Sequence, residues 1–547
     1  MAAQHVPHAS PWFGADEDSF HFGGNGAAQS GFLPAARLHA LNGGTTLSTP
    51  TMADEITYIS AITGAGKIAN PSFAAWNEPS FPATYTNSTL AAKWGSATPG
   101  TSGGTIKYFF DAASSWTATE KAVFTDCLKL WSDFANIKFA LASSKGAADL
   151  LITRGHSGAF DQSSFTSSNP NAGKAGGSVL WTTTGSTLSI DTSVPGFGPI
   201  TKDFTKDGGY PWTTILHELG HAIGLGHGGP YDEGSSVDPL QAQYSPYDSR
   251  LWTLMSYIDP SDSGAKFFSS YPVKGTDWGT VTQGAQIWNN NPTTPMMLDI
   301  LAAQALYGKP AATVFNGGDI FGFHTNLPSN VPFYDFTLNV NPVVTIWDSG
   351  TGNTLDLSGF AAASRINLNA GTFSSCNGQK NNICIATGTK IDSFVGGKGN
   401  DTVTANKDGD HITGGLGADK LTAGAGHDVL VYAAAGQSTS SHFDIVSKFN
   451  ATVDTFDLWF SVSGALHTYS SGSLSKATFD SDLASDLSGK LGAHHFDLFT
   501  PSAGDYAGKT FLVVDANGTP GYQAGADLVI ELAAGTSLSS LASGNFT

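Results

Sequence analysis

The chain has 547 residues, too many for one compact core, and its 40 % hydrophobic and 11 % aromatic content argues against global disorder. The formal net charge is −19 and only 13 % of the residues are charged, so no basic face for a nucleic acid is expected. Only seven of the 45 acidic residues are Glu. The others are Asp, which favours turns and supplies hard oxygen ligands to Ca²⁺. With 65 glycines, the composition predicts two or three packed domains rich in turns and β-structure.

The N-terminal segment carries no export or membrane signal of the usual kind. Its first 20 residues contain neither a basic stretch nor an apolar core, so a Sec signal peptide is not expected. No apolar run of about 18 residues occurs, so no transmembrane segment is expected. Residues 1–50 are rich in Gly, Ala, Ser and His, and we interpret them as an N-terminal extension or prosegment.

The three cysteines are Cys127, Cys376 and Cys384, which is no disulfide framework. Cys376 and Cys384 could close a small loop in an exported protein, and the sequence leaves this pairing open. Cys127 stands among apolar residues of a predicted helix, which indicates a buried thiol.

The sequence after residue 100 predicts distinct helices and strands. Residues 105–110 predict a strand. Thr117 and Glu120 form a capping box that opens an amphipathic helix of four or five turns. Two β-like runs, 149–153 and 177–182, come next and precede a second helix. This succession predicts a mixed α/β domain.

The domain organisation follows from a change in composition. We assign residues 51–294 to the mixed α/β domain. A helix over residues 295–307 ends before Gly308 and could bridge two domains. The chain beyond it consists of short apolar stretches, Asp, Asn and Gly, so residues 295–547 are predicted to form a mostly β C-terminal domain.

A nine-residue repeat runs through this C-terminal domain, from about residue 387 to 431. Its units GGKGNDTVT, ANKDGDHIT, GGLGADKLT and AGAGHDVLV begin at residue 396. Asp recurs at the sixth position and an apolar residue at the eighth, which is the pattern of a Ca²⁺-binding parallel β-roll. The glycines allow tight turns whose carbonyls face inward, and the Asp carboxylates bind Ca²⁺ between turns. The predicted calcium residues of the repeat are Gly396, Gly397, Gly399, Asp401, Asp410, Gly414, Gly415, Gly417, Asp419, Gly424, Gly426 and Asp428.

Two nonapeptides make one coil of such a roll, so each Asp should stack on the Asp two units later, as Asp401 on Asp419. The second unit departs from the pattern at its first two positions, Ala405 and Asn406, which makes its Ca²⁺ site less certain. A Gly/Asp-rich linker is the alternative. Five consecutive Asp in register, beginning with Asp392, disfavour it.

The segment HELGHAIGLGH carries the chemistry of the first domain. His217 and His221 are four residues apart on a predicted helix, so both imidazoles project from one face. Glu218 lies between them, where it can reach a metal-bound water but not the metal. Gly224 lets the chain leave the helix sharply, and His227 can return as a third ligand. Three neutral nitrogens with an open position indicate a catalytic Zn²⁺ site, and the length of the motif disfavours an accidental or structural histidine cluster.

A second motif follows the histidines. The run LMSY contains Met255, 28 residues after the third histidine, and ends at Tyr257. This position fits the Met-turn of metzincins, which packs beneath the zinc.

HELGHAIGLGH, LMSY and the nonapeptide repeats together resemble the serralysin family of RTX-repeat metzincin zinc metalloproteases of the M10 type. The stretches LDILAAQALYG (298–308), WDSGTGNTLDLSGF (347–360) and RINLNAGTFSS (365–375) also resemble that family. The likeness spans roughly residues 100–460, and the first 50 residues do not contribute.

The resemblance implies roles that the spacing alone does not. Tyr257 matches a tyrosine that is an extra zinc ligand in the resting enzyme and supports the transition state. Further Ca²⁺ ligands are implied at Asp348, Gly350, Asp356 and Asp392. The family is secreted to the extracellular space by the type I secretion apparatus, through a C-terminal signal, which fits the missing signal peptide.

Three positions depart from the family pattern. Serralysins usually have Pro after the third histidine, whereas this chain has Gly228. Asn353 stands where Asp is common, which would weaken one Ca²⁺ site. The C-terminal LASGNFT is not a strong match to the usual secretion tail.

The expected fold class is therefore α+β multidomain: a metzincin catalytic domain, then a C-terminal Ca²⁺-binding parallel β-roll and β-sandwich domain with a β-rich secretion region. The expected function is that of a secreted zinc endopeptidase, in which Glu218 assists the attack of zinc-bound water on peptide bonds. One catalytic Zn²⁺ and several structural Ca²⁺ ions are the expected cofactors.

Proteins and peptides are the expected substrates, and a proteinaceous inhibitor is a further candidate partner. An extended substrate would pair with residues 177–182 as an edge strand. The main alternative is a Ca²⁺-dependent adhesin or surface-layer protein with an inactive protease domain, which the intact Glu218 and three histidines disfavour. A narrow-specificity maturation protease or toxin would share the chemistry and differ in substrate.

Overall fold

The structure is a computed structural model. It describes residues 49–69 and 91–547, apart from 157, 195–196, 198–199, 203–208, 232–237, 284–285 and 534. Almost the whole expected N-terminal extension (1–50) lies outside the described residues.

The described residues form two compact units. The first consists of residues up to Val314 together with Leu338–Thr345, and the second of Phe315–Thr337 and Ile346–Thr547. The domain limits at residues 50 and 294 remain a proposal. In the structure, the helix that follows residue 294 belongs to the first unit.

The first unit contains a six-stranded sheet with parallel strands in the order β1-β6-β4-β2-β3 and with β5 antiparallel to β6. These strands are β1 (Ala92–Lys93), β2 (Gly104–Phe110), β3 (Ile137–Leu141), β4 (Leu150–Arg154), β5 (Phe160–Thr166) and β6 (Trp181–Ile190). A separate hairpin pairs β7 (Thr280–Gln283) with β8 (Gln286–Asn289).

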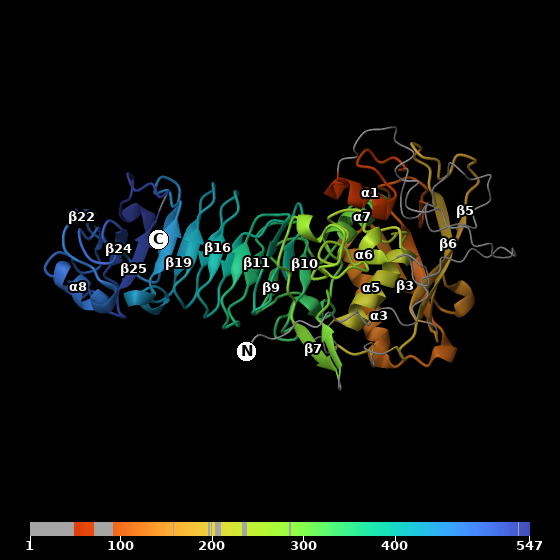
Figure 1. Cartoon of the computed structure of the whole chain (residues 1–547), viewed down its shortest axis with the longest axis horizontal. Helices are drawn as coiled ribbons and strands as arrows, with labels where there is room; N and C mark the ends of the chain where they lie inside the picture. The colour runs from red at the N-terminus through yellow and green to blue at the C-terminus, as the bar shows by residue number, and fades with distance from the viewer. Residues whose placement is uncertain are drawn as a thin grey trace. The chain divides into compact units, whose positions relative to one another are not determined.

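The helices of this unit include those that carry and support the histidines. They are α1 (Met52–Ser60), α3 (Ala118–Phe134), α5 (Tyr210–Ala222), α6 (Pro239–Ala242) and α7 (Met297–Tyr307). The predicted capping box opens α3: the Thr117 hydroxyl accepts the N–H of Glu120 at 3.2 Å, and the Glu120 carboxylate accepts the N–H of Thr117 at 2.8 Å. Helices α3 and α5 lie side by side (Figure 1), joined by the Trp131 indole N–H that donates to the Leu216 carbonyl at 3.3 Å.

One expectation for the sheet is wrong. Residues 177–180 form no strand, and β6, which begins at Trp181, is paired on both sides. Trp181 pairs with Ala92 of β1, and Thr182 pairs with Thr166 of β5. Among the described strands, β5 pairs with β6 alone and packs against α5, so β5 is the edge strand beside the histidine helix. The sequence did not reveal this because residues 160–166 are polar and lack a clear apolar alternation.

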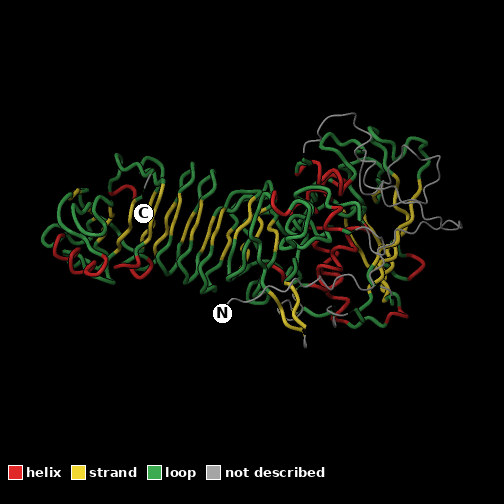
Figure 2. Tube along the Cα trace, in the orientation of Figure 1, coloured by secondary structure: helices red, strands yellow, loops and turns green. Residues whose placement is uncertain are grey.

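The second unit is built from short strands that alternate between two parallel sheets, as Figures 1 and 2 show. One sheet contains β9 (Ile320–Gly322), β11 (Thr354–Asp356), β15 (Ser393–Val395), β17 (His411–Thr413), β19 (Val429–Tyr432) and β21 (Thr455–Leu458). The other contains β12 (Arg365–Asn367), β16 (Thr402–Thr404), β18 (Lys420–Thr422) and β20 (Asp444–Ser447). The apolar residue at the eighth repeat position is buried in every coil, as Val403 and Leu421 show, and the two rows fill the space between the sheets.

The far end of the second unit is a separate core. Strand β20 pairs with β25 (Leu528–Leu532), and the sheet continues through β24 (Thr510–Val514), β23 (Phe496–Phe499) and β22 (His467–Tyr469). Helix α8 (Phe479–Asp486) packs its Phe479 and Leu483 into this core.

The remaining strands are β10 (Val344–Ile346), β13 (Thr372–Ser374) and β14 (Ile383–Ile385), of which β13 and β14 pair antiparallel. The expected architecture, a mixed α/β region with the histidines followed by parallel β-sheets wound into a roll, is confirmed. None of the helices in the described part of the chain combines the length and the apolar character that a bilayer crossing requires.

Candidate metal centres

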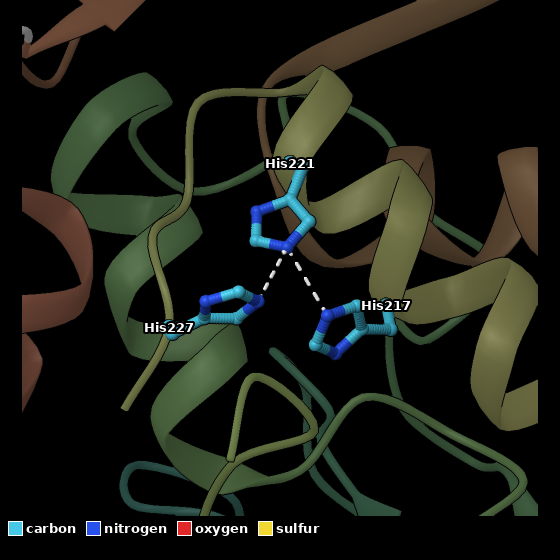
Figure 3. Close-up of side chains that lie close together, drawn as sticks. All are labelled: His217, His221 and His227. Carbon is cyan, nitrogen blue, oxygen red and sulfur yellow. Dashed lines mark hydrogen bonds between the residues drawn. The ribbon is translucent and has the colours of Figure 1, made fainter. Parts of the chain in front are cut away.

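Three imidazoles meet at one point of the first unit (Figure 3). The Nε2 atom of His221 lies 3.1 Å from Nε2 of His217 and 3.0 Å from Nε2 of His227. All three side chains are buried. The spacing of the motif therefore brings the three predicted ligands together.

The other nitrogen of each ring fixes its protonation state. Nδ1 lies 2.8 Å from the Leu254 carbonyl in His217, 2.9 Å from the Leu225 carbonyl in His221, and 3.1 Å from the Tyr231 carbonyl in His227. A carbonyl oxygen only accepts, so each Nδ1 carries the hydrogen and each Nε2 of a neutral ring presents a lone pair.

This donor set fits zinc. Three lone pairs that converge in a buried site repel one another unless a cation lies between them. Tetrahedral zinc with bonds of about 2.0–2.1 Å holds its nitrogens roughly 3.3–3.4 Å apart, close to the observed separations. The carbonyl behind each ring is the usual support of a zinc-ligating histidine.

The end of α5 delivers the third histidine as expected. The helix ends at Ala222. Gly224 has a backbone φ of 97°, a value that residues with a side chain rarely adopt. A Cβ at Gly224 would also collide with the main-chain carbonyl of Ala92. Glycine is thus required here by both backbone angle and space. Glu218, the predicted proton acceptor, is buried on the same helix.

The predicted Met-turn lies against the histidine helix. A Cβ at Gly220 would lie 2.7 Å from the Met255 sulfur, so the thioether packs on the helix between the two histidines. The turn is held from behind by Asp299, whose carboxylate accepts the Leu254 N–H at 2.7 Å and the Thr253 hydroxyl at 2.5 Å. Sequence reasoning missed Asp299, although it opens the predicted third helix.

Tyr257 lies over the imidazoles. Its ring centroid is 4.6 Å from that of His227 and 6.0 Å from that of His217. It also stacks on Tyr231, with ring centroids 5.0 Å apart. The structure therefore brings the Tyr257 ring next to two of the three imidazoles.

Gly228, where the family usually has proline, meets two buried carboxyl groups. A Cβ at this position would lie 2.5 Å from Oδ1 of Asp248 and 3.3 Å from Oε1 of Glu55. Asp248 accepts the hydroxyls of Tyr231 at 2.5 Å and Ser256 at 2.7 Å. The two carboxyl groups occupy the space that a larger residue would need, and this explains the departure.

The two carboxyl groups also influence each other. Burial raises the pKa of Asp248 to about 6. Burial, and then the neighbouring Asp248, raises the pKa of Glu55 well above its usual range. Ser245 donates its hydroxyl to Glu55 at 2.5 Å and thereby ties α1 to the loop that carries Asp248. Neither carboxyl group was anticipated from the sequence, because they meet only through the tertiary fold.

Cys127 is buried in α3, and burial raises the pKa of its thiol well above the usual range. Cys376 and Cys384 are both buried, and none of the three cysteines, which all lie in the described part of the chain, forms a disulfide in the structure. The predicted burial of Cys127 is confirmed.

The repeat aspartates form two ladders on the two sides of the roll. In one ladder the N–H of Asp401 donates to Oδ1 of Asp419 at 2.7 Å, and the N–H of Asp419 donates to Asp444 at 2.8 Å. In the other, the N–H of Asp410 donates to Asp428 at 2.9 Å. The expected stacking of each Asp on the Asp two units later is therefore observed.

The glycines of the repeat stand where successive coils touch. A Cβ at Gly396 would collide with the carbonyl of Gly414, and one at Gly415 with that of Gly397. The same holds against neighbouring backbone or carboxylate atoms for Gly397, Gly399, Gly414, Gly417, Gly424 and Gly426. These glycines are required by the close approach of the coils.

The residues implied upstream lie in the first coils of the same roll. Oδ1 of Asp348 accepts the Gly350 N–H at 2.6 Å, and Asp356 lies 2.9 Å from Nδ1 of His324. Facing Asp348 is Asp319, which the sequence did not reveal. Burial, and then Asp348, raises the pKa of Asp319 to about 7.

Both ladders extend beyond the predicted repeats. The N–H of Asp428 donates to Asp454 at 3.0 Å, as that of Asp419 does to Asp444. The insertions before Asp444 and Asp454 break the nine-residue period, which is why both were missed. The signal that remains in the sequence is an Asp followed two residues later by a buried apolar residue, Val446 and Phe456.

The surroundings of Asp419 fit a bound Ca²⁺ ion, whereas those of Asp410 do not. Asp419 is fully buried, and its Oδ2 has no hydrogen-bond partner among the described residues. A buried carboxylate oxygen without a hydrogen-bond donor is unfavourable unless a cation binds to it. By contrast, both carboxylate oxygens of Asp410 accept hydrogen bonds from Asn406, through its main-chain N–H and its side-chain amide, at 2.6 Å each.

Comparisons with known proteins agree with these features. Residues 311–473 match the family model described as Peptidase M10 serralysin C terminal. The chain is 37 % identical over 198 residues to "Serralysin" of Proteus mirabilis, which is 36 % of this chain and 35 % of that protein. It is 29 % identical over 293 residues to "Metalloprotease AprA" of Pseudomonas entomophila, 53 % of each chain. It is 31 % identical over 299 residues to "Serralysin" of Photorhabdus luminescens, again 53 % of each.

The matches thus span between about a third and half of these relatives' length. A solved structure, the subunit of a mannuronan C5-epimerase from Azotobacter vinelandii, matches 36 % of this chain and 77 % of its own at 18 % identity. Its TM-score of 0.18 is too low to bear on the fold. The matched C-terminal region, the relatives and the three-histidine cluster confirm the resemblance to the serralysin family of M10 metalloproteases, and residues 311–473 carry that family's C-terminal region.

Proposed function

We propose that this chain is a zinc-dependent endopeptidase that hydrolyses peptide bonds in proteins. The observation that carries the proposal is the convergence of three Nε2 lone pairs at one buried point, with Glu218 buried on the helix that carries two of the histidines. Names of the relatives point to the same chemistry, but the matched stretches cover only part of their length.

His217, His221 and His227 would hold the zinc ion. When bound, it supplies a Lewis acid that polarises the scissile carbonyl and makes a nearby water more acidic. Glu218 accepts a proton from the attacking water and passes it to the nitrogen of the leaving amine. Its burial on α5, directly after His217 in the chain, shields the carboxylate from bulk solvent.

Tyr257 is proposed to donate its hydroxyl to the oxyanion that develops on the scissile carbonyl. Its ring centroid lies 4.6 Å from that of His227, so the phenol stands next to one of the three histidines. Stacking on Tyr231 limits the tilt of this ring and thereby presets the direction of the hydroxyl.

An extended substrate would pair with β5 (Phe160–Thr166). This strand packs against α5, the helix that carries His217 and His221, and among the described strands only β6 pairs with it. The proposal replaces the edge strand that residues 177–182 were expected to provide.

We also propose that the roll binds structural Ca²⁺ and that the protein is secreted through a type I apparatus, as the family resemblance implies. Uncompensated carboxylates of the ladders would repel one another at low Ca²⁺, so the roll would be unfolded before export and would fold outside the cell. Circular dichroism with Ca²⁺ and with EGTA tests this. An unchanged β-sheet signal on chelation would rule the calcium part out.

The enzymatic proposal is tested by metal analysis together with casein cleavage by the purified full chain. We expect one zinc per chain, loss of cleavage when a chelator removes the metal, and recovery when zinc is returned. Cleavage that persists in metal-free protein would contradict the proposal.

A further inference from the structure

The two ladders of the roll are chemically different, and the difference centres on the turn before Asp392. On one side of this turn lies the coil that carries Asn353, and on the other side the coil that carries Asn406. The register places Asn353 directly before the pair Thr354 and Ser393, so Asn353 holds the ladder position in its own coil. Both asparagines are buried.

The side-chain amide of Asn406 bridges two coils. Its Nδ2 donates to the Ile391 carbonyl at 2.6 Å and to Oδ1 of Asp410 at 2.6 Å. One main-chain carbonyl and one Asp carboxylate oxygen are the ligand types that Ca²⁺ takes in such a turn. The amide therefore fills the coordination that an ion between these coils would use.

Asn353 makes the same kind of contact from the other side. Its Nδ2 donates to the Lys390 carbonyl at 3.0 Å, and its Oδ1 accepts the Asp319 N–H at 3.1 Å. Two consecutive carbonyls, those of Lys390 and Ile391, are thus each held by an asparagine amide.

The charge of this region is also compensated within the chain. Nζ of Lys390 lies 2.6 Å from Oδ1 of Asp392. The other oxygen of Asp392 accepts the N–H of Gly352 at 2.6 Å and that of Asn353 at 3.2 Å. Both oxygens of Asp392 are therefore satisfied by donors of the protein.

The ladder on the opposite sheet lacks these substitutions. Oδ1 of Asp419 accepts the Asp401 N–H, while its Oδ2 is buried without a hydrogen-bond partner among the described residues. The repeat unit that contains Asp419 has Gly415 at its second position, whereas the unit that contains Asp410 has Asn406 there. Gly415 has no side chain that could donate a hydrogen bond.

We propose that Asn353, Asn406 and Lys390 replace Ca²⁺ in the coils around Asp392 and Asp410, so that this part of the roll is closed by protein groups while the Asp401–Asp419–Asp444 ladder binds the ions. The proposal rests on the calcium-binding roll proposed above. It removes Asp392 and Asp410 from the expected calcium ligands and explains why the family's Asp is replaced at position 353.

The test is the number of Ca²⁺ ions bound per full-length chain, measured by equilibrium dialysis with metal analysis. Asn406→Asp keeps the shape and turns the bridging donor into a carboxylate that faces Asp410 and the Ile391 carbonyl. This variant should gain one ion. Asn400→Asp is the matched control, because it adds the same charge at an exposed position of a neighbouring coil and should gain none.

The complementary pair is Asp410→Asn and Asp419→Asn. The first should bind as many ions as the wild type, and the second should lose at least one. Loss of an ion in Asp410→Asn would overturn the proposal, as would a folded Asn406→Asp that gains none. If Asp410→Asn does not fold, the number of ions bound by Asn406→Asp alone decides. A wild-type chain that binds no Ca²⁺ would instead refute the calcium part of the proposed function.

Discussion

The Asp299 carboxylate accepts the main-chain N–H of Leu254 at an N···O distance of 2.7 Å. The main-chain carbonyl of the same Leu254 accepts the hydrogen on Nδ1 of His217, at an N···O distance of 2.8 Å. A buried carboxylate on α7 thus sets the position of one metal-facing imidazole without touching it. The link runs through the turn that contains Met255.

Asp299→Asn should therefore weaken metal retention. The amide oxygen can still accept the Leu254 and Met296 N–H groups, which share Oδ2, but the amide NH2 replaces the oxygen that accepts the Thr253 hydroxyl, and the negative charge that holds the turn is lost. We expect zinc affinity to fall about 10- to 100-fold, measured by competition with a chromogenic chelator. Asp149→Asn is the control, because this carboxylate also accepts a main-chain N–H, that of Lys107, but at the sheet. Equal zinc affinities in the two variants would contradict the account.

Gly228→Ala should lower the free energy of unfolding by about 1–3 kcal/mol. The new Cβ would lie 2.5 Å from the buried Asp248 carboxylate, which Tyr231 and Ser256 hold in place. Urea unfolding measures the loss. Gly264→Ala is the matched control, since its Cβ would find only an ordinary contact of 3.5 Å with Leu240. The steric explanation fails if both variants are as stable as the wild type.

The sequence predicted those parts of the site that lie at fixed spacings. His217 and His221 are one helical turn apart, and Asp401 and Asp419 one coil apart, so a period is enough to bring each pair together. Strand β5 and the pair of Glu55 with Asp248 were not predictable, because they depend on which distant segments pack together. A nine-residue period likewise cannot show that an amide has taken the place of an ion.

Tyr257→Phe should lower kcat on the order of 100-fold, because it removes one donor to the oxyanion. The aromatic stacking on Tyr231 and the zinc content should persist. Steady-state kinetics on a peptide substrate, with kcat and KM separated, checks this. A rise in KM at unchanged kcat would show that the hydroxyl serves binding instead.

The calcium-free roll should be more stable at pH 5 than at pH 8. Burial raises the pKa of Asp419 from 3.8 to about 7. The folded state therefore binds a proton that the unfolded chain releases at lower pH, and the stabilisation is lost as pH rises through about 7. With Ca²⁺ the dependence should reverse, because the ion needs the charged carboxylate.

The size of the β-sheet circular dichroism signal in EGTA, measured from pH 8 down to pH 5, follows this dependence, because protonation should restore structure that the calcium-free roll lacks at higher pH. Asp419→Asn should flatten it, since the amide does not titrate. The same slope in variant and wild type would show that other groups cause it.

The most direct test of the central claim is the casein cleavage rate of Glu218→Gln, measured with its zinc content. Glutamine keeps the shape of the side chain and cannot accept the proton. We predict that one zinc per chain is retained and that cleavage falls by on the order of 10²- to 10⁴-fold. A variant that is folded, holds zinc and still cleaves casein at the wild-type rate would contradict it.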